Sequence, residues 1–425
     1  MDINSPRGTT DIFGPDIKYR DFIISCCRQL FEIFNYREII TPAFEYTEVF
    51  NRGIGQGTDI VKKEMYTFSD KKGRSITLRP EGTAPVVRAI IEHKLYSSVL
   101  PLRLFYIGNM FRYERPQKGR MREFWQIGVE AAGSDNPLTD AEVIWLLNEI
   151  FKKLGFKNLE LLINSVGCLK CRPEYVKVFK KFLEPETGKL CPDCNERFLS
   201  NPLRIFDCKV ETCREALEGS PVIYDHICGQ CSEHFDAVKN YLDLLGIKFL
   251  IKSGLVRGFD YYTGTIFEIV SKDLESVQNA LGGGGRYDNL IEQFGGPPMP
   301  SIGFALGIDR TVILLKQLNI NIPEENQNAK ISVILLNNKF SNYGLRVLKF
   351  LRERGFSCEM KGESKSVTGM IRSAEKNGFS HVVIIGEDEI KSDNLTVKNL
   401  KTFKQTSFNW KKDGDGAAGI FGGLR

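Results

Sequence analysis

Polar side chains that suit ligand binding recur between Phe111 and Gly133, in the segment FRYERPQKGRMREFWQIGVEAAG. If its second half is a strand, alternation places apolar residues such as Ile127 and Val129 on one face, and Gln126 and Glu130 on the other. The apolar face needs a core. The polar face is too costly to bury without partners, so we expect it to line a solvated cavity that holds a ligand.

The preceding stretch, residues 103–114, has the same character and carries Arg112 and Glu114 on one face. Joined to Gln126 and Glu130 by the basic turn ERPQKGR, it makes a hairpin that presents donors and acceptors to one cleft. Such a set can hold both an anion and an amine or imidazole. The alternative is an ordinary hairpin with one solvated face, and it weakens because further segments of this kind follow.

Three of these segments lie elsewhere in the chain. Glu81 sits in a Pro-Glu-Gly turn within TLRPEGT, where the backbone is irregular. VRGFDYYTGTIF offers Arg257 and two tyrosines, Tyr261 and Tyr262, which would point to opposite faces of a strand, so at most one is simply core. GGGGRYD, residues 282–288, lets a planar ligand approach the backbone closely.

Arg310 in SIGFALGIDR is predicted in the first turn of a helix that follows a strand of small residues. A cation there opposes the helix dipole unless an anion also binds at that end, which favours a phosphate ligand. A Walker loop is excluded because its GxxxxGK[ST] spacing is absent. GIGQGT at Gly53 lacks a preceding strand and a following helix, so we reject a dinucleotide fingerprint as well.

Eight of the eleven cysteines fall between Cys168 and Cys231 and mark a separate module. Paired cysteines at this spacing suit structural zinc, because a tight turn points two thiolates at one ion. Two tetrahedral sites, one site with spare thiols, and metal-free thiols all remain open. The four pairs are Cys168 with Cys171, Cys191 with Cys194, Cys208 with Cys213, and Cys228 with Cys231.

The elements that must position these residues follow from periodicity and turn signals. We predict helices over residues 15–34, 140–154 and 308–318, and an antiparallel sheet in the stretch 62–132. Residues 1–325 then form one body with the cysteine-rich insertion at about 168–240. Alternating strands and helices at 329–412 predict βαβ units and a parallel sheet, and the Gly-rich tail 413–425 is expected to be disordered.

Charge is divided unequally between these parts. The whole chain has a net charge of +5, but residues 329–412 hold 16 Lys and Arg against 8 Asp and Glu, so the remainder is slightly acidic. A basic satellite on such a body suggests a polyanionic partner. No run of 18 apolar residues and no N-terminal apolar segment appears, so we expect no membrane span and a cytoplasmic protein.

Taken together, these motifs resemble the histidyl-tRNA synthetases, a family of class II aminoacyl-tRNA synthetases. The resemblance covers nearly the whole chain, and each motif stands in the family's order. The matching segments are RGTTDIFG, ITPAFEYTEVF (motif 1), TLRPEGTA, FRYERPQKGRMREFWQ (motif 2), LVRGFDYYTG (the histidine-specific motif) and GFALGIDR (motif 3).

The resemblance implies an α+β catalytic domain built on a six-stranded antiparallel sheet, with the cysteine-rich insertion and a C-terminal α/β anticodon-binding domain. It implies a homodimer formed through motif 1 around Pro42, and tRNA(His), L-histidine, and ATP with Mg²⁺ as ligands. In this family the histidine carboxylate attacks the α-phosphate of ATP, and the resulting adenylate passes histidine to the 3′ end of the tRNA. An ionised carboxylate needs no general base, in keeping with a catalytic region built from arginines.

The family's site residues carry over onto matching positions. The resemblance implies that Arg112, Arg257 and Arg310 are catalytic and contact the phosphates, with Arg257 at the α-phosphate and Arg310 at the γ-phosphate. ATP binding falls to Arg112, Glu114 and Arg310. The residues expected to bind histidine are Glu81, Gly82, Thr83, Arg112, Gln126, Glu130, Arg257, Tyr261 and Tyr262. By the same resemblance, any metal on the insertion cysteines would be structural.

Two other functions compete with this one. A non-catalytic synthetase paralogue could act as a histidine-sensing regulatory subunit of histidine biosynthesis, but such paralogues usually lack the arginine of the histidine motif and the anticodon domain. A zinc-ribbon nucleic-acid binder explains the cysteines and leaves Arg112, Glu130 and Arg310 without a role.

Overall fold

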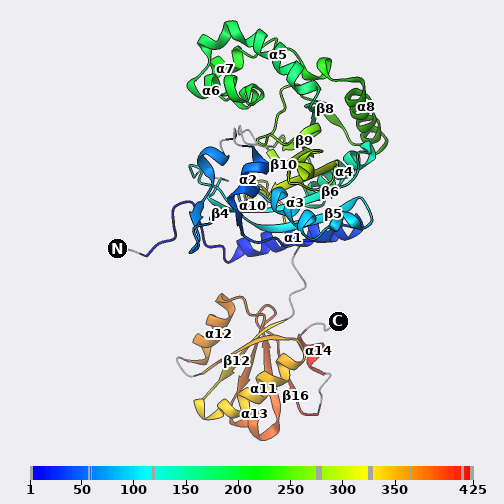
Figure 1. Cartoon of the computed structure of the whole chain (residues 1–425). Coiled ribbons are helices and arrows are strands. Elements are labelled where there is room, and N and C mark those ends of the chain that lie inside the picture. The colour runs from blue at the N-terminus through cyan, green and yellow to red at the C-terminus, as the bar shows by residue number, and fades with distance from the viewer. Residues whose placement is uncertain are drawn as a thin grey trace. The chain divides into compact units, whose positions relative to one another are not determined.

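The computed structural model describes residues 3–55, 58, 60–116, 120–273, 280–323, 329–362, 366–412 and 416–421. The chain divides into two compact units, Met1–Ile322 and Pro323–Arg425, each described by itself (Figure 1). Residues 117–119 of the predicted basic turn, residues 324–328, and residues 413–415 and 422–425 of the tail lie outside the described residues. Within the described part of the chain, no helix combines the length and apolar character that a membrane crossing requires.

An eight-stranded sheet forms the centre of the first unit. Six strands in the order β5-β6-β11-β10-β9-β7 pair antiparallel, and the short strands β1 and β8 add in parallel at its two edges. The strands are β1 (Arg37–Glu38), β5 (Leu102–Phe111), β6 (Glu123–Ala132), β7 (Leu159–Ser165), β8 (Phe249–Ile251), β9 (Thr263–Ser271), β10 (Ala280–Arg286) and β11 (Ser301–Gly307).

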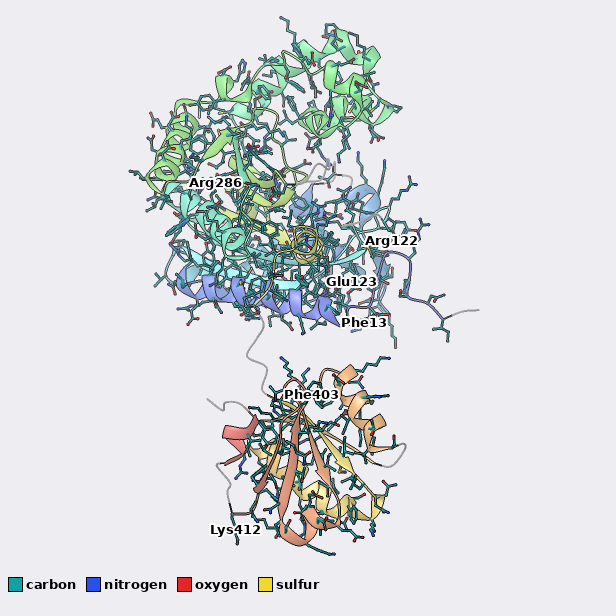
Figure 2. All side chains as sticks on the ribbon, turned by 180° about the vertical axis from the view of Figure 1, so that it is seen from behind. Phe13, Arg122, Glu123, Arg286, Phe403 and Lys412 are labelled. Carbon is teal, nitrogen blue, oxygen red and sulfur yellow. The ribbon has the colours of Figure 1, made fainter. Side chains whose placement is uncertain are left out.

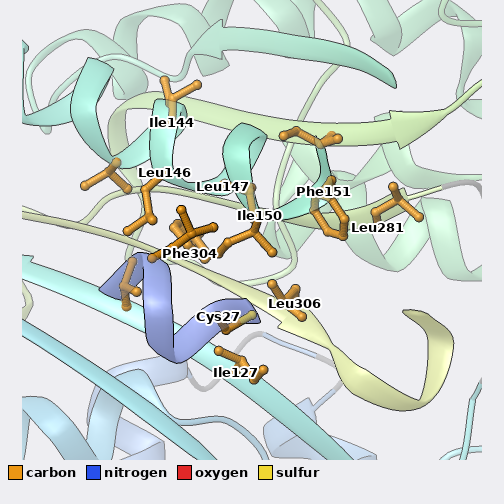
Figure 3. Close-up of a cluster of buried hydrophobic side chains, with 14 of the residues drawn as sticks. Cys27, Ile127, Ile144, Leu146, Leu147, Ile150, Phe151, Leu281, Phe304 and Leu306 are labelled. Carbon is orange, nitrogen blue, oxygen red and sulfur yellow. The ribbon is translucent and has the colours of Figure 1, made fainter. Parts of the chain in front are cut away.

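One face of this sheet is covered by helices α1 (Pro15–Ile33), α4 (Pro137–Lys153), α8 (Gly229–Leu244) and α10 (Ile308–Gln317). Side chains of α4, among them Leu147 and Phe151, share this core with Phe304 and Leu306 of β11, and Ile127 of β6 lies beside Cys27 of α1 (Figure 3). The predicted alternation of β6 is confirmed, since its odd-numbered residues from Trp125 to Ala131 enter this core. The even-numbered residues are therefore left for the opposite face.

The opposite face carries helix α3 (Thr83–Glu92), where the sequence predicts only sheet. Two backbone amides of its first turn donate to the Glu81 carboxylate, and Val86, Val87 and Ile90 are fully buried. The cap and the apolar stripe therefore stabilise a helix in this segment, although its composition is typical of a strand. Around it lie the small sheet β2 (Phe44–Tyr46), β4 (Ser75–Leu78) and β3 (Thr67–Ser69), and the helices α2 (Thr47–Ile54), η1 (Ile60–Glu64), η2 (Leu95–Ser97) and α9 (Leu290–Gln293).

The insertion leaves the sheet after β7 and returns to it at β8 (Figure 1). Short helices separated by irregular segments make up its whole length, and the last of them, α8, packs against α4 in the main core. In chain order they are α5 (Cys171–Leu183), η3 (Glu184–Lys189), α6 (Pro192–Ser200), η4 (Pro202–Asp207), α7 (Glu211–Glu215), η5 (Ile223–His226) and α8.

The second unit is a mixed sheet in the order β13-β12-β14-β15-β16. Its first three strands pair in parallel, as predicted, but β15 and β16 form an antiparallel hairpin that the sequence analysis did not foresee. Figure 2 shows Phe403 at the tip of this hairpin and Lys412 at the other end of the unit. The strands are β12 (Lys330–Leu335), β13 (Ser357–Lys361), β14 (His381–Ile385), β15 (Asn394–Asn399) and β16 (Gln405–Asn409).

The helices of this unit are η6 (Asn338–Phe340), α11 (Ser341–Glu353), α12 (Val367–Lys376), α13 (Glu387–Ser392) and α14 (Gly416–Phe421). The last of them corrects the prediction that residues 413–425 are disordered. Phe421 is only 3% exposed and its ring packs against Phe356, His381 and Phe408. A single aromatic anchor orders this part of a tail whose composition otherwise indicates disorder.

Candidate functional site

The face of the central sheet that carries α3 also holds a cavity of about 350 Å³, to which β10 and β11 contribute several glycines and alanines. Glu130 of β6 pairs with Gly303 of β11, and a Cβ atom on Gly303 would lie 2.0 Å from the Glu130 carboxylate. Gly283 pairs with Glu268 in the same way on the other side. The lining residues among those predicted are Glu81, Thr83, Arg112, Glu114, Gln126, Glu130, Arg257, Tyr261, Tyr262 and Arg310.

Two buried carboxylates face one part of this cavity. The Glu130 carboxylate accepts hydrogen bonds from the Thr83 hydroxyl at 2.7 Å and from the Tyr287 hydroxyl at 2.5 Å. Glu81 accepts from the backbone amides of Thr83 and Ala84 at 2.6 and 2.8 Å. Glu81 thereby caps α3 while one side of its carboxylate borders the cavity, which gives the turn glutamate a structural task as well as a place in the site.

Burial is the main cause of the shifted acidity of both groups. It raises the pKa of Glu130 to about 8, and it also raises the pKa of Glu81. A bound cation would favour the ionised forms of both groups. In the ligand-free protein these two carboxylates therefore favour a cationic ligand beside them.

Gln126 and Tyr106 complete this part of the wall. The side-chain oxygen of Gln126 is buried and has no hydrogen-bond partner among the described residues, so it awaits a donor. Tyr106 was not predicted. Its ring lies against Gly82 and Gly128, where added Cβ atoms would come within 2.3 and 2.4 Å of it. Gly82 therefore makes room for Tyr106 and does not itself line the cavity.

Guanidinium groups gather where β6 begins and β11 ends. Arg112 donates from Nε to the Pro80 carbonyl at 2.8 Å, and its guanidinium lies 5.3 Å from the ring centre of Phe124 and 5.8 Å from that of Phe259. These contacts hold the side chain across the cavity wall. Its terminal nitrogen Nη1 stands 3.9 Å from Glu114 Oε1, a loose ion pair that leaves the arginine able to bind an anion.

Arg310 and Arg257 approach the cavity from other elements. Arg310 donates to the Ala280 carbonyl at 2.9 Å, and burial, with the nearby Arg120 guanidinium second, lowers its pKa. Arg257 donates to Glu268 Oε2 at 2.8 Å. Its buried Nε has no hydrogen-bond partner within the described part of the chain. An anion bound here would relieve both the crowding of cations and the unused donor.

Asp309 connects the start of α10, which carries Arg310, to neighbouring elements of the first unit. Its carboxylate accepts from the Trp125 amide at 2.7 Å and from Arg20 Nη1 at 2.7 Å. Arg20 in turn lies over the Trp125 ring at 4.9 Å. The start of α10, β6 and α1 are joined at this point, so Arg310 projects from a braced helix end.

Two expectations about backbone need correction. Tyr261 and Tyr262 precede β9 and lie in a loop, which lets both rings face the cavity where a strand would have separated them. In the GGGG run, Gly282 and Gly283 line the cavity, but Gly284 is required by packing, since its Cβ would lie 1.9 Å from the Gly303 carbonyl. Only part of the run therefore serves a ligand.

Some residues of the wall escaped the sequence analysis although a signal existed. Tyr106 shares the parity of Arg112 on one strand, and Glu268 is a lone charge within the apolar run TIFEIV. Tyr287 directly follows the glycine run. Outside the cavity, Arg286 lies in the interior of the first unit (Figure 2), where it pairs with the fully buried Asp140.

The eight insertion cysteines form two groups in which the four sulfurs lie within 4.8 Å of one another. The pairing is nested, with the middle two pairs enclosed between the first and the last. Backbone amides at Cys194 and Cys231 lower the pKa of Cys191 and Cys228. We call Cys168, Cys171, Cys228 and Cys231 the outer cluster, and Cys191, Cys194, Cys208 and Cys213 the inner cluster.

Comparison with known families agrees with this geometry. The family model described as histidyl-tRNA synthetase matches residues 8–171 and 206–311, and one described as anticodon binding domain matches residues 330–412. The first model is interrupted over residues 172–205, which contain the first half of the inner cluster.

Curated relatives match over nearly their whole length. A histidine–tRNA ligase of Halothermothrix orenii is 48% identical over 405 residues, which is 95% of this chain and 96% of that protein. One of Clostridioides difficile is 44% identical over 404 residues, with the same coverage.

Solved structures give the same result. The crystal structure of apo histidyl-tRNA synthetase of Staphylococcus aureus superposes with a TM-score of 0.81 at 35% identity and covers 99% of both chains. A Bacillus halodurans protein described as an ATP phosphoribosyltransferase regulatory subunit/histidyl-tRNA synthetase shares the fold, with a TM-score of 0.60, 22% identity, and coverage of 87% of this chain and 96% of that one.

Proposed function

The chain belongs to the histidyl-tRNA synthetase family, and from this we infer that it is a histidine–tRNA ligase, which activates L-histidine with ATP and transfers it to tRNA(His). The regulatory alternative is less supported, because the similarity to the regulatory-type structure shows the fold alone. Arg257, whose equivalent such paralogues usually lack, lines the cavity of this chain.

One observation carries the assignment to this site: a single cavity joins two buried carboxylates and a free amide oxygen to a group of guanidiniums. Glu130 lies four residues along β6 from Gln126, which pairs with Gly307 immediately before the helix that carries Arg310. An amino acid with two cationic groups suits the acidic part, and a triphosphate suits the arginines. The α-carboxylate of the amino acid would then meet the α-phosphate of the triphosphate between the acidic part and the arginines.

In this scheme the histidine carboxylate attacks the α-phosphorus, the bond to the β-phosphate oxygen breaks, and pyrophosphate leaves. Arg112 and Arg257 neutralise charge on the reacting phosphate, and Arg310 holds the leaving group. Glu81, Thr83, Gln126, Glu130, Tyr261 and Tyr262 select histidine, because a side chain without ring N–H donors leaves buried acceptors unpaired. Glu114 and Glu268 line the cavity and would supply carboxylate oxygens of the kind that Mg²⁺ prefers, and the ion bound with ATP would offset phosphate charge.

The test is histidine-dependent exchange between ATP and labelled pyrophosphate. We expect exchange with histidine and none with histidinol, which keeps the amine and imidazole, lacks the carboxylate, and should compete with histidine. If folded protein exchanges no label with histidine, or exchanges it equally with glutamine, the assignment fails.

We also propose that each cysteine cluster binds one structural zinc ion. Four thiols within reach of one another match the tetrahedral all-sulfur sites that zinc prefers. Elemental analysis should find about two zinc ions per chain. Cys208→Ser should lower this to about one, whereas Cys358→Ser, which alters a cysteine outside both clusters, should leave it unchanged. Zinc-free native protein would contradict the proposal.

For the second unit we propose tRNA binding through its excess positive charge. A chain ending at Gln327 should keep histidine-dependent exchange within about threefold, because the cavity lies wholly in the first unit. Its aminoacylation of tRNA should fall by about 100-fold, and the remaining reaction should depend less steeply on salt because phosphate contacts are lost. Equal losses in exchange and aminoacylation would contradict this division of labour.

A homodimer is proposed through the region around Pro42. Large apolar side chains are exposed there at Ile40, Phe44, Tyr46 and Phe68, with exposed fractions of 83%, 55%, 50% and 50%. Three of these residues lie on the small sheet of β2, β3 and β4. Several exposed apolar side chains on one small sheet are typical of a protein–protein interface.

A further inference from the structure

We propose that Arg172 is a positioning residue through which the outer cysteine cluster holds the two histidine-binding tyrosines in place. The inference rests on the proposed function of the cavity and adds to it a role for the insertion. The outer cluster would then govern affinity for histidine, in addition to stabilising the insertion fold.

The contacts of Arg172 carry the proposal. Its Nη1 donates to the Asp260 carbonyl at 3.2 Å, and its Nη2 donates to the Tyr262 carbonyl. These two carbonyls flank Tyr261, so one guanidinium clamps the backbone on both sides of that residue. Both carbonyls precede strand β9, which begins at Thr263, so the backbone ladder of the sheet starts only after them.

The guanidinium is inserted into the structure and does not merely rest on its surface. The Nε atom of Arg172 is buried and finds no hydrogen-bond partner among the described residues. Desolvation on this scale is tolerated where the remaining donors make good bonds. Arg172 thus donates from both terminal nitrogens to the loop, while its Nε is left buried without a hydrogen bond.

The outer cluster fixes where Arg172 stands. Cys171 is the first residue of α5, and its sulfur accepts from the Cys228 amide at 3.0 Å. Just before the outer cluster in the chain, the Gly167 carbonyl accepts a hydrogen bond from the Gly264 amide at 3.0 Å. The loop is therefore held at one end by backbone pairing and at the other by the arginine that follows a cluster cysteine.

The inner cluster adds a second brace at the same point. Asn201, which lies between Cys194 and Cys208, donates from its side-chain amide to Asp260 Oδ1 at 2.5 Å. The amide of Asp260 also reaches the Ile54 carbonyl at 3.3 Å. Asp260 is thus the residue at which the insertion, the tyrosine loop and α2 meet.

The primary test compares Arg172→Ala, Arg172→Lys and Arg214→Ala in the full chain. Arg214 is the matched control, because it also follows a cluster cysteine and its side chain is exposed. Loss of two bonds from a charged donor should raise the KM for histidine by about 10- to 100-fold in Arg172→Ala. The KM for ATP, kcat and the zinc content should stay within about threefold of wild type, and lysine should restore part of the affinity.

Coupling to the cluster is tested with Cys228→Ser, alone and combined with Arg172→Ala. If the cluster acts through Arg172, each single change raises the KM for histidine and the double change adds little more, whereas independent effects would multiply. Cys208→Ser should have the smaller effect, since Asn201 bonds to the side chain of Asp260, whereas Arg172 bonds to the backbone of the loop. Multiplying effects of Cys228→Ser and Arg172→Ala would overturn the coupling.

Hydrogen–deuterium exchange gives a readout that does not depend on activity. In Arg172→Ala the amides of residues 260–264 should exchange faster, while peptides of the outer cluster keep their protection. Unchanged exchange, or an unchanged KM for histidine, overturns the proposal. If Arg172→Ala loses zinc or fails to fold, the same measurements on Arg172→Lys decide. A wild-type protein that does not activate histidine refutes the proposed function, and the exchange data still test the clamp.

Discussion

Arg257→Ala is expected to lower the rate of histidine-dependent ATP–pyrophosphate exchange by about 1,000-fold. Removing one preorganised donor from a site where negative charge develops costs about 100- to 1,000-fold in many enzymes. Here the loss is compounded, because Arg257 also neutralises Glu268, which it contacts at 2.8 Å. Without the arginine, a carboxylate borders the path of the incoming triphosphate.

The effect should lie in the chemical step. Calorimetry should find histidine binding changed by less than about tenfold, because the buried carboxylates and Gln126 remain. Arg28→Ala removes a comparable arginine–glutamate pair, with Glu38, from α1 on the far face of the sheet, and it should leave exchange within about twofold of wild type. More than a tenth of wild-type exchange in Arg257→Ala would contradict the role given to this residue.

Glu130→Gln is expected to raise the KM for histidine by about 100-fold. Glu130 is 2% exposed, and a bound cation is the partner that its negative charge lacks. The neutral amide keeps the shape of the side chain and loses the charge. Glu92→Gln, at the exposed end of α3, is the matched control and should leave the KM unchanged.

The pH dependence of binding follows from the protonation of this group. Its pKa of about 8 in the free enzyme means that Glu130 must lose a proton before it can pair with a cation. The KM for histidine should therefore fall as the pH rises from 6.5 to 8.5 in wild type, and more steeply than in Glu130→Gln. The substrate's own imidazole titration is common to both enzymes and cancels in this comparison. Parallel profiles would contradict the assignment.

Stability of the ligand-free protein should show the opposite trend. Because the folded pKa lies above the ordinary value of 4.5, the folded state holds a proton that the unfolded state releases. The stabilisation is complete below about pH 4.5 and is lost as the pH rises through 8. Thermal unfolding at pH 6 and pH 8.5 should therefore show wild type losing stability relative to Glu130→Gln. An unchanged difference between the two proteins would show that Glu130 titrates normally.

Much of the site followed from short-range pattern. Alternation along β6 separated Gln126 and Glu130 from the core residues Ile127 and Val129, because a strand side chain has only two faces to choose from. The oddly placed Arg310 pointed to an anion, and it does line the cavity. These are statements about one residue and its neighbours in the chain, which sequence alone can support.

What escaped prediction depends on contacts between distant segments. Helix α3 begins where it does because Glu81 caps it, and that cap is not visible as a standard N-cap residue. The pairing of cysteines into nested clusters, and the pocket that accepts Phe421, require knowledge of which segments meet in space. Tyr261 and Tyr262 both reach the cavity only because the chain leaves strand geometry before Thr263.

The nested arrangement of the two cysteine clusters bears on how the insertion can diverge in sequence and length. The outer cluster brings the start and the end of the insertion together at one point, and the chain between them touches the rest of the first unit again where Asn201 contacts Asp260. Because its two ends are joined at the cluster, such a segment can change in length between its contact points while β7 and β8 keep their spacing. The stretch 172–205, where the family model is interrupted, lies entirely within it. Two residues of this stretch, Arg172 and Asn201, contact Asp260 in the tyrosine loop, so we expect change there to be restricted to the positions between them.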